Sequence, residues 1–284
     1  MTEMDADTLR AQMAARWERG AEGWARRADL IRTFGMPVSA WMIDHADLQP
    51  GQEVLELAAG PGDTGFLAAE LVLPGGRLIS SDASEAMLEV ARERARGQRV
   101  ENVEFKRLEL EWIDMETASV DAVLCRWGLM FPPDPGAALQ EIRRVLRPGG
   151  RLALAAWDDP ERNPWATIPT RALIELGHME PPEPDAPGMF VLAADGRLEG
   201  LLEDAGFTEV TVESLELPRN DGNVERFLQE TLDLSRPFAD VRERLSDEEW
   251  VRVEAKVAEL AAPYAGPDGT LRFPASALVA AASA

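Results

Sequence analysis

The residues that most clearly suggest chemistry are three glycines and an aspartate that follows them. Gly60, Gly62 and Gly65 form a G-x-G-x-x-G pattern, and Asp82 comes about twenty residues later. Glycines allow a ligand to approach the backbone closely, and a helix that begins in such a loop offers free N–H groups. Asp82 is spaced to bind a ribose. The pattern predicts a site for an adenosine-bearing cofactor, either a nicotinamide or flavin dinucleotide or a different one.

Three details favour a different cofactor. Glu56 lies shortly before Gly60 at the end of a predicted strand, where its charge repels a pyrophosphate and suits a cationic ligand. Pro61 removes one N–H from the loop, which weakens a phosphate site. Residues 146–150, which read Leu-Arg-Pro-Gly-Gly and end a predicted helix, are not part of a nicotinamide-enzyme pattern. An NAD(P)-dependent oxidoreductase is therefore the less favoured alternative.

Strands alternate with helices around these residues. Apolar strands are predicted at 54–57, 77–81, 103–105, 120–125 and 151–156, with helices at 64–72, 84–96 and 134–146. This alternation predicts a parallel sheet that is covered on both faces and doubly wound through right-handed crossovers. Ligands bind at the carboxyl ends of the strands in such sheets, which places the glycine loop at the site.

The flanking regions are predicted to be mainly helical. Helices are expected at 5–27, 38–47, 165–176, 197–205, 224–234 and 247–262, strands at 208–217 and 271–280, and a proline-rich break at 181–188. We divide the chain into an N-terminal helical cap (1–48), a cofactor-binding core (49–157) and a remainder (158–284). Helical insertions near 160–190 and 220–268 of this remainder are expected to form a substrate lid.

Composition argues against several classes of function. The net charge of −22 disfavours a nucleic-acid partner, because binding to phosphates needs clustered cations. The only cysteine, Cys125, has no disulfide partner in the chain, which fits a reducing compartment. No basic leader precedes an apolar segment, and no run of about 18 apolar residues occurs. With two histidines and no Cys/His ligand spacing, no metal is expected. We expect a cytoplasmic protein without a membrane span, either a monomer or a homodimer.

Five motifs follow one another in a recognisable order. They are residues 54–62 (VLELAAGPG), 82–88 (DASEAML), 105–109 (FKRLE), 121–127 (DAVLCRW) and 144–152 (RVLRPGGRL). In this order the chain resembles the class I S-adenosylmethionine-dependent methyltransferases and, within them, the UbiE-like small-molecule methyltransferases. The resemblance implies an α/β, Rossmann-like fold. Its doubly wound, mostly parallel seven-stranded sheet would have an antiparallel last strand and helical lid insertions.

The resemblance also implies how S-adenosylmethionine is held. Asp82 is expected to accept hydrogen bonds from both ribose hydroxyls, or else only to cap the next helix. Glu56 is expected near the methionine ammonium group, and Glu109 stands where the family commonly has an aspartate for the adenine. Arg126 either binds the carboxylate of the cofactor or an anionic substrate, or else forms a solvated or structural salt bridge. The predicted cofactor-binding residues are Trp24, Glu56, Ala58, Gly60, Gly62, Asp82, Ala83, Met87, Glu109, Leu110 and Arg126.

The implied reaction transfers a methyl group to O, N or C of a small aromatic or apolar acceptor and leaves S-adenosylhomocysteine. In-line displacement on a sulfonium needs alignment and exclusion of water more than a catalytic group. Where a base is needed, His178 is the candidate. The residues expected in the substrate pocket are Trp17, Trp127, Met130, Trp157, Trp165 and Phe190. A non-catalytic S-adenosylmethionine-binding regulator or activating subunit remains an alternative.

Overall fold

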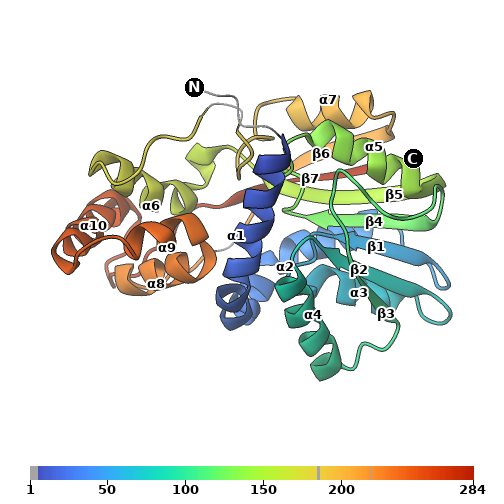
Figure 1. The fold of residues 1–284 in the computed structure, drawn as a ribbon, viewed down its shortest axis with the longest axis horizontal. Coiled ribbons are helices and arrows are strands. Elements are labelled where there is room, and N and C mark those ends of the chain that lie inside the picture. Colours follow the sequence, from blue (N-terminus) through green and yellow to red (C-terminus); the bar gives the residue numbers. More distant parts are fainter. Residues whose placement is uncertain (1–5, 184–185, 218) are drawn as a thin grey trace.

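A seven-stranded sheet in the order β3-β2-β1-β4-β5-β7-β6 forms the centre of the computed structural model, which describes residues 6–183, 186–217 and 219–284 (Figure 1). The strands are β1 (Glu53–Leu57), β2 (Arg77–Asp82), β3 (Val103–Arg107), β4 (Val120–Arg126), β5 (Leu146–Trp157), β6 (Thr208–Glu216) and β7 (Ser276–Ser283). β1 to β5 pair in parallel, whereas β7 is antiparallel to both β5 and β6. The predicted fold class is confirmed.

The strand order reverses beside β1. The chain moves outward from β1 to β3 and then returns to place β4 on the other side of β1, so the carboxyl ends of β1 and β4 meet at the switch point. Most side chains of β1, β4, β5 and β7 are buried, which requires cover on both faces. The helices that pack on this sheet are α2 (Ala28–His45), α3 (Asp63–Leu71), α4 (Glu85–Gln98), α5 (Pro135–Val145) and α7 (Arg197–Asp204).

Polar caps fix where two of these helices begin. Ser84 accepts a hydrogen bond from the Met87 N–H at the start of α4, and Asp134 accepts one from the Ala137 N–H at the start of α5. Because each cap comes shortly after the end of a strand, it also determines the length of the loop at the carboxyl edge of the sheet. The cap at Ser84 matters most for the site, because it lies two residues after Asp82.

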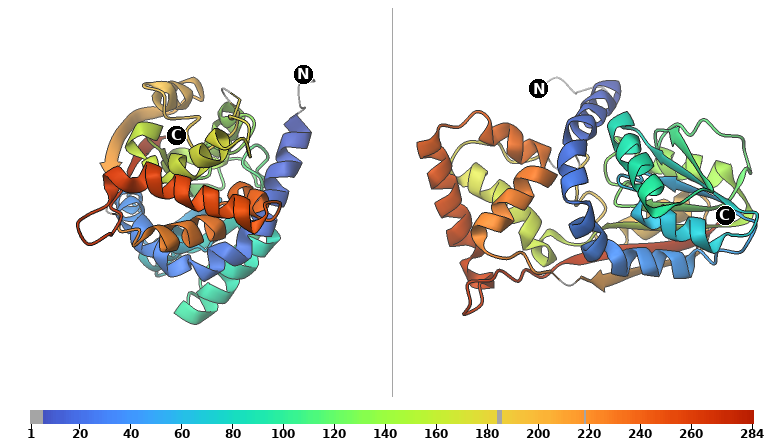
Figure 2. Two further views of the ribbon diagram at one scale, coloured as in Figure 1. Left: turned by 90° about the vertical axis from the view of Figure 1, so that its left-hand side faces the viewer. Right: turned by 90° about the horizontal axis from the view of Figure 1, so that it is seen from below.

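A helical subdomain lies beside the sheet (Figure 1). It consists of α6 (Pro164–Glu175), α8 (Val224–Leu234), α9 (Arg236–Arg242) and α10 (Asp247–Ala261), with short 3-10 turns at Pro160–Arg162 and Ala262–Tyr264. Its buried side chains, among them Phe227, Phe238 and Trp250, form a hydrophobic cluster separate from that of the sheet. α1 (Ala6–Arg26) stands between the two parts and packs on α4 as well as on α8 and α9 (Figure 2).

Two predicted elements are corrected by the structure, and one helix was not predicted. α2 begins at Ala28 rather than at residue 38, and Pro37 lies inside it. A proline in a helix costs about 3 kcal/mol, but the buried residues Ile31 and Met42 stabilise the helix on both sides of it. The last strand is Ser276–Ser283 rather than 271–280, because Leu271 instead pairs with Gly222 and Ala265 in isolated bridges. The separate helix α9 was not predicted.

Some predictions fall on residues outside the described part of the chain. Residues 1–5, 184–185 and 218 are not described, so the first residues of the predicted cap and the middle of the proline-rich segment 181–188 remain without a structural account. Among the described residues, no helix has both the length and the apolar character needed to span a bilayer.

Candidate active site

The loop between β1 and α3 has a backbone that favours small residues. Ala58, Gly60 and Gly62 have φ angles of 50°, 51° and 85°, in the left-handed region. A Cβ atom on Gly60 would meet nothing within 4 Å, whereas one on Gly62 would lie 2.5 Å from the ring of Phe66. Gly60 thus borders open space, and Gly62 lets Phe66 pack against the loop.

Asp82, at the end of β2, is held by two backbone N–H groups. Its Oδ2 accepts a hydrogen bond from Gly60 N at 2.9 Å, and its Oδ1 accepts one from Ser84 N at 2.9 Å. Burial raises the pKa of Asp82, while the two hydrogen bonds act in the opposite direction. A carboxylate offers about four acceptor positions. About two therefore remain for ribose hydroxyls, so capping the turn and binding a ribose are compatible roles.

Glu56 is buried at the end of β1 and contacts the first turn of α3. Its Oε1 accepts a hydrogen bond from Gly65 N at 2.7 Å, and its Oε2 accepts one from Ser80 Oγ at 3.0 Å. A Cβ atom on Gly65 would lie 2.2 Å from Oε2, so this glycine makes room for Glu56. Burial raises the pKa of Glu56 to about 7, although the bonds from Gly65 and Ser80 lower it. The Glu56 carboxyl group therefore occupies a backbone N–H group at the start of α3, where the pyrophosphate of a dinucleotide would otherwise bind.

Arg126, at the end of β4, takes part in a buried ionic network. Its Nη2 lies 3.6 Å from Asp63 Oδ2, and its Nη1 donates to Ser39 Oγ at 3.0 Å. Arg94 binds the other oxygen of Asp63, Oδ1, at 2.5 Å. Burial lowers the pKa of Arg126, and the charge of Asp63 acts in the opposite direction. The structure thus contains the structural salt bridge, while contact of Arg126 with a cofactor or substrate stays a prediction.

The residues expected around an adenine lie at the start of α4 and after β3. Met87 is buried, Ala83 and Leu110 are half-buried, and Glu109 is exposed. The carbonyl of Ala83 accepts a hydrogen bond from Arg107 Nε at 2.9 Å, so the end of β3 and the start of α4 lie together. This arrangement would allow residues from both segments to contact one adenosine. The contribution of each side chain to adenosine binding stays a prediction.

α1 is attached to both sides of this region. Glu18 accepts a hydrogen bond from the Ser84 hydroxyl at 2.7 Å, two residues from Asp82, and Arg10 pairs with Glu111 at 2.9 Å. Trp24 donates from its Nε1 to the Leu234 carbonyl at 3.3 Å, at the end of α8. The indole N–H of Trp24 therefore binds the helical subdomain. Contact between Trp24 and a cofactor stays a prediction. Glu18 was not among the predicted site residues, because it belongs to no local motif.

Four aromatic rings gather at the carboxyl ends of β4 and β5, and we call them the aromatic cluster: Phe34, Trp127, Trp157 and Trp165. Trp127 and Trp157 stack with ring centroids 4.5 Å apart, and Phe34 stacks at 6.0 Å and 5.9 Å from them. Trp165 meets Trp157 edge-on at 4.9 Å. Three predicted substrate residues thus come together. Phe34 was missed, because it lies before residue 38, where the predicted helix begins.

The other predicted substrate residues lie outside the aromatic cluster. The ring of Trp17 contacts Phe131 at 5.0 Å, edge to face, in the segment after β4. Met130 is buried, and its carbonyl accepts a hydrogen bond from Gly188 N at 3.0 Å, which brings the segment before the half-buried Phe190 to the same loop. Their roles in substrate binding stay predictions.

Gly128 connects the cofactor loop with the aromatic cluster. A Cβ atom on Gly128 would lie 2.5 Å from the Cβ of Ala58 and 2.9 Å from the Sγ of Cys125. The loop after β4 therefore touches the loop after β1, and the next residue toward β4 is Trp127. Burial raises the pKa of Cys125 to about 12, so its thiol is not a reactive nucleophile.

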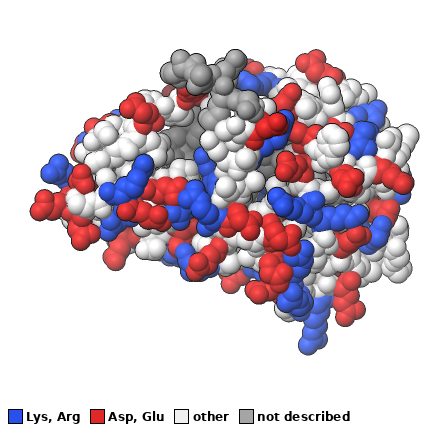
Figure 3. All heavy atoms as spheres, viewed as in Figure 1, with Lys and Arg blue, Asp and Glu red and all other residues white. Residues whose placement is uncertain are grey.

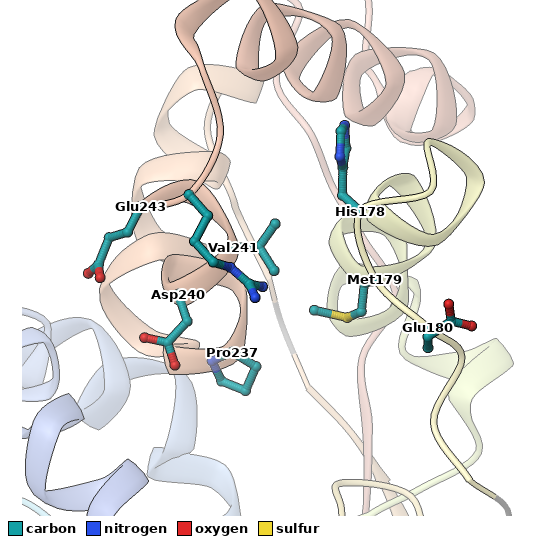
Figure 4. A pocket seen from close by; sticks show the side chains of 8 residues that line it. His178, Met179, Glu180, Pro237, Asp240, Val241 and Glu243 are labelled. Atoms are coloured by element: carbon teal, nitrogen blue, oxygen red, sulfur yellow. The ribbon is translucent and has the colours of Figure 1, made fainter.

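His178 lies in a different environment. It lines a hollow of about 650 Å³ together with Met179, Glu180, Pro237, Asp240, Val241, Glu243 and Arg244. Figure 4 shows His178 and Met179 on one side of this hollow and the residues of α9 on the other. None of the predicted cofactor-binding residues lines it, and a catalytic role for His178 stays a prediction. Within the described ranges, no group of three His, Cys, Asp or Glu residues is arranged to hold a metal ion.

Known proteins share both the sequence pattern and the fold. Residues 48–175 match a family model described as a methyltransferase domain. A UbiE ubiquinone/menaquinone biosynthesis C-methyltransferase from Klebsiella pneumoniae is 30% identical over 183 residues, covering 61% of this chain and 73% of that protein. A demethylmenaquinone methyltransferase from Lactococcus lactis is 37% identical over 110 residues, covering 39% of this chain and 44% of that protein. The chain spans only 34%, 44% and 47% of the lengths of three curated relatives that it matches.

Solved structures show the same architecture. The YcgJ protein of Bacillus subtilis aligns with a TM-score of 0.59 at 18% sequence identity, covering 87% of this chain and 98% of that one. At this identity the likeness establishes the fold alone.

The sheet order, the loop after β1 and the carboxylate at the end of β2 define a class I S-adenosylmethionine-dependent methyltransferase, and this chain belongs to that class. Within the class it is of the UbiE type. Its cofactor is S-adenosylmethionine, as predicted. The open space beside Gly60 and the acceptor positions left on Asp82 fit the adenosine part of that cofactor.

Proposed function

We propose that this chain transfers a methyl group from S-adenosylmethionine to O, N or C of a small aromatic or apolar molecule. When bound, S-adenosylmethionine supplies an activated methyl group. The observation that carries the proposal is the contact between Gly128 and Ala58, which joins the cofactor loop to the segment that bears Trp127. A cofactor on the loop after β1 would thereby lie beside the aromatic cluster.

The residues of the chain would act by holding and aligning the reactants. Asp82 and Gly60 would hold the adenosine part, while stacked rings such as Trp127 and Trp157 would orient a flat acceptor and exclude water. Alignment of this kind supplies much of the rate enhancement in displacement reactions. Two relatives are named for quinone or menaquinone methylation, which supports an acceptor that contains a ring.

The position of Glu56 speaks against a nicotinamide cofactor. Its carboxyl group binds Gly65 N in the first turn of α3, so the pyrophosphate of a dinucleotide would have to displace a buried carboxyl group from that helix end. A cofactor without phosphate does not meet this repulsion. The G-x-G-x-x-G pattern thus supports a sulfonium cofactor better than a dinucleotide.

Calorimetry with S-adenosylmethionine and S-adenosylhomocysteine, followed by turnover measurements on a panel of ring-containing acceptors, tests the proposal. Binding of both compounds with micromolar affinity and transfer of radiolabelled methyl groups is the expected result. Absence of binding would refute it. Tight binding without transfer to any acceptor would favour the alternative of a regulator or activating subunit.

General-base catalysis by His178 is a separate part of the proposal. A positioned base accelerates proton transfer by roughly 100-fold or more. If the acceptor must lose a proton to His178, His178→Gln should lower kcat by about that factor with little change in the affinity for S-adenosylmethionine. Unchanged turnover would show that alignment suffices, in line with a hollow around His178 that none of the predicted cofactor-binding residues lines.

We also propose that the partner is a small molecule rather than a nucleic acid. Acidic and basic side chains alternate over the face seen in Figure 3, where no broad basic area is visible, and the net charge is −22. A single buried thiol, Cys125, is compatible with the proposed cytoplasmic location. The division into cap, core and lid, and a monomeric or homodimeric state, are retained as proposals that size-exclusion chromatography and limited proteolysis can test.

A further inference from the structure

We propose that the methyl acceptor carries an anionic oxygen group, such as a carboxylate, and that Arg219 binds this group beside the aromatic cluster. The inference rests on the proposed function and narrows the substrate to a class: a flat, ring-containing acid. Two hydrogen-bond donors without partners among the described residues, one on Arg219 and one on Trp127, carry the argument.

Arg219 follows β6 and reaches the aromatic cluster. Its guanidinium carbon lies 4.1 Å from the ring centroid of Trp165 and 4.9 Å from that of Phe34. The side chain is only 14% exposed. A planar guanidinium that stacks on aromatic rings is well suited to bind a carboxylate through an edge that remains free.

Only one part of this guanidinium is used by the protein. Nε donates to Asp221 Oδ1 at 2.8 Å, and Nη2 binds the same oxygen. Within the described part of the chain, Nη1 makes no hydrogen bond. Asp221, itself buried, therefore fixes the orientation of the guanidinium and leaves another edge for a ligand.

The second free donor belongs to Trp127. Its indole Nε1 is buried and has no hydrogen-bond partner among the described residues, although a buried N–H group normally has one. Trp127 also has a φ of 58°, which is uncommon for a bulky residue and occurs mainly where function requires it. Since both Trp127 and Arg219 contact Phe34, the two donors belong to side chains around a single ring.

Each arginine beside the aromatic cluster is paired with a buried aspartate, so an anionic ligand would be bound by free hydrogen-bond donors rather than by an excess of positive charge. Arg126 lies over the ring of Trp127 at 5.1 Å and is paired with Asp63, while Arg219 lies over Phe34 and Trp165 and is paired with Asp221. The cations thus contact the aromatic faces directly. A flat acid would stack on apolar rings and place its oxygens on donors that no other group uses.

Matched probes can test this inference. 2-Naphthoate and 2-naphthamide have the same ring system, but only the first is charged, and ligand-observed NMR titration gives both dissociation constants on the chain saturated with S-adenosylhomocysteine. A charge-assisted hydrogen bond should make 2-naphthoate bind about tenfold more tightly than the amide. Arg219→Gln should reduce this preference to about twofold or less. Trp127→Phe, which keeps an aromatic ring but removes the N–H, should weaken binding of 2-naphthoate by about threefold or more.

Arg242→Gln is the control, because Arg242 also stacks on a tryptophan, Trp250 at 5.0 Å, but in the helical subdomain. It should keep the full preference for 2-naphthoate. If Arg219→Gln does not fold, the double variant Arg219→Gln/Asp221→Asn replaces it, because it removes both charges of the ion pair. The double variant should show the same loss of preference for 2-naphthoate over 2-naphthamide.

Equal binding of the two probes, no binding of either, or a preference that survives the loss of Arg219 would overturn the inference. Calorimetry with S-adenosylhomocysteine on the same samples separates the two proposals. Without cofactor binding the proposed function fails, whereas cofactor binding without the charge preference contradicts only the assignment of Arg219.

Discussion

Gly128 lies so close to Ala58 that a Cβ atom on Gly128 would be 2.5 Å from the Cβ of Ala58. Ala58 has a positive φ of 50°, a conformation that costs alanine more than glycine. The contact therefore has room for the methyl group of Ala58 on the loop after β1, but not for a second methyl group at Gly128 on the loop after β4. The pair determines how closely the ends of β1 and β4 approach, and with them the cofactor loop and Trp127.

Gly128→Ala should therefore destabilise the chain and weaken cofactor binding. Overpacking of this kind costs about 1–3 kcal/mol in the free energy of unfolding, which guanidinium unfolding measures. Ala58→Gly removes the opposing methyl group but leaves the Sγ of Cys125 2.9 Å from the new Cβ atom, so the double variant should recover only part of the loss. Equal losses in the single and the double variant would contradict the proposed contact, and Ala58→Gly alone serves as the control.

Asp82→Ala should weaken binding of S-adenosylmethionine by about 1.5–3 kcal/mol, because hydrogen bonds to a charged group are lost. Calorimetry measures this change directly. Asp134→Ala is the matched control, since Asp134 also accepts a backbone hydrogen bond at the start of a helix but lies on α5. It should lower stability by about 1 kcal/mol and leave the affinity unchanged. Affinity equal to that of the wild type in Asp82→Ala would refute the ribose assignment.

Glu56 should make stability depend on pH. Its pKa rises from 4.5 to about 7 in the folded chain because of burial. Between these two pKa values, Glu56 keeps its proton in the folded state but loses it in the unfolded state. The contribution of Glu56 to the free energy of unfolding therefore falls as the pH rises through this window, and it is constant at higher pH. Glu56→Gln does not titrate. The wild type should lose about 3 kcal/mol relative to this variant between about pH 4.5 and pH 8. A difference that is independent of pH, measured by guanidinium unfolding across this window, would contradict the prediction.

Two glycines of α1 offer a test of its attachment to α8. A Cβ atom on Gly23 would lie 1.9 Å from the carbonyl oxygen of Asp233, whereas one on Gly20 would be 3.9 Å from the nearest atom, in Trp24. Gly23→Ala should separate α1 from α8 and lower the melting temperature. Gly20→Ala should raise stability by about 0.5–1 kcal/mol, as expected for alanine in a helix. The same response to both substitutions would argue against close packing at Gly23.

Much of the sheet was predictable because its signals are local. The short apolar runs and the caps at Ser84 and Asp134 predicted strands and helices close to those in the structure. α2 was one exception, because the spacing of apolar residues predicted a helix only from residue 38, whereas burial of Ile31 and Met42 keeps the helix continuous from Ala28. Local propensity does not include such tertiary stabilisation.

The meeting of the glycine loop with Asp82 was predictable for a related reason. Gly60 and Asp82 lie at the ends of adjacent parallel strands, so their spacing in the sequence places them together once the strands pair. The roles of Glu18 and Arg219 were not predictable. Glu18 acts across 66 residues through Ser84, and Arg219 contacts Phe34 only because the segment after β6 lies against α2.

By itself, the sequence determined the doubly wound sheet and the meeting of the glycine loop with Asp82 at its carboxyl edge, because periodicity, caps and the glycine loop act over a few residues. Only the tertiary structure decided which aromatic side chains meet, that Arg219 joins them, and that His178 faces a separate hollow. Such contacts depend on how helices and loops pack over the sheet, and no local pattern specifies that packing.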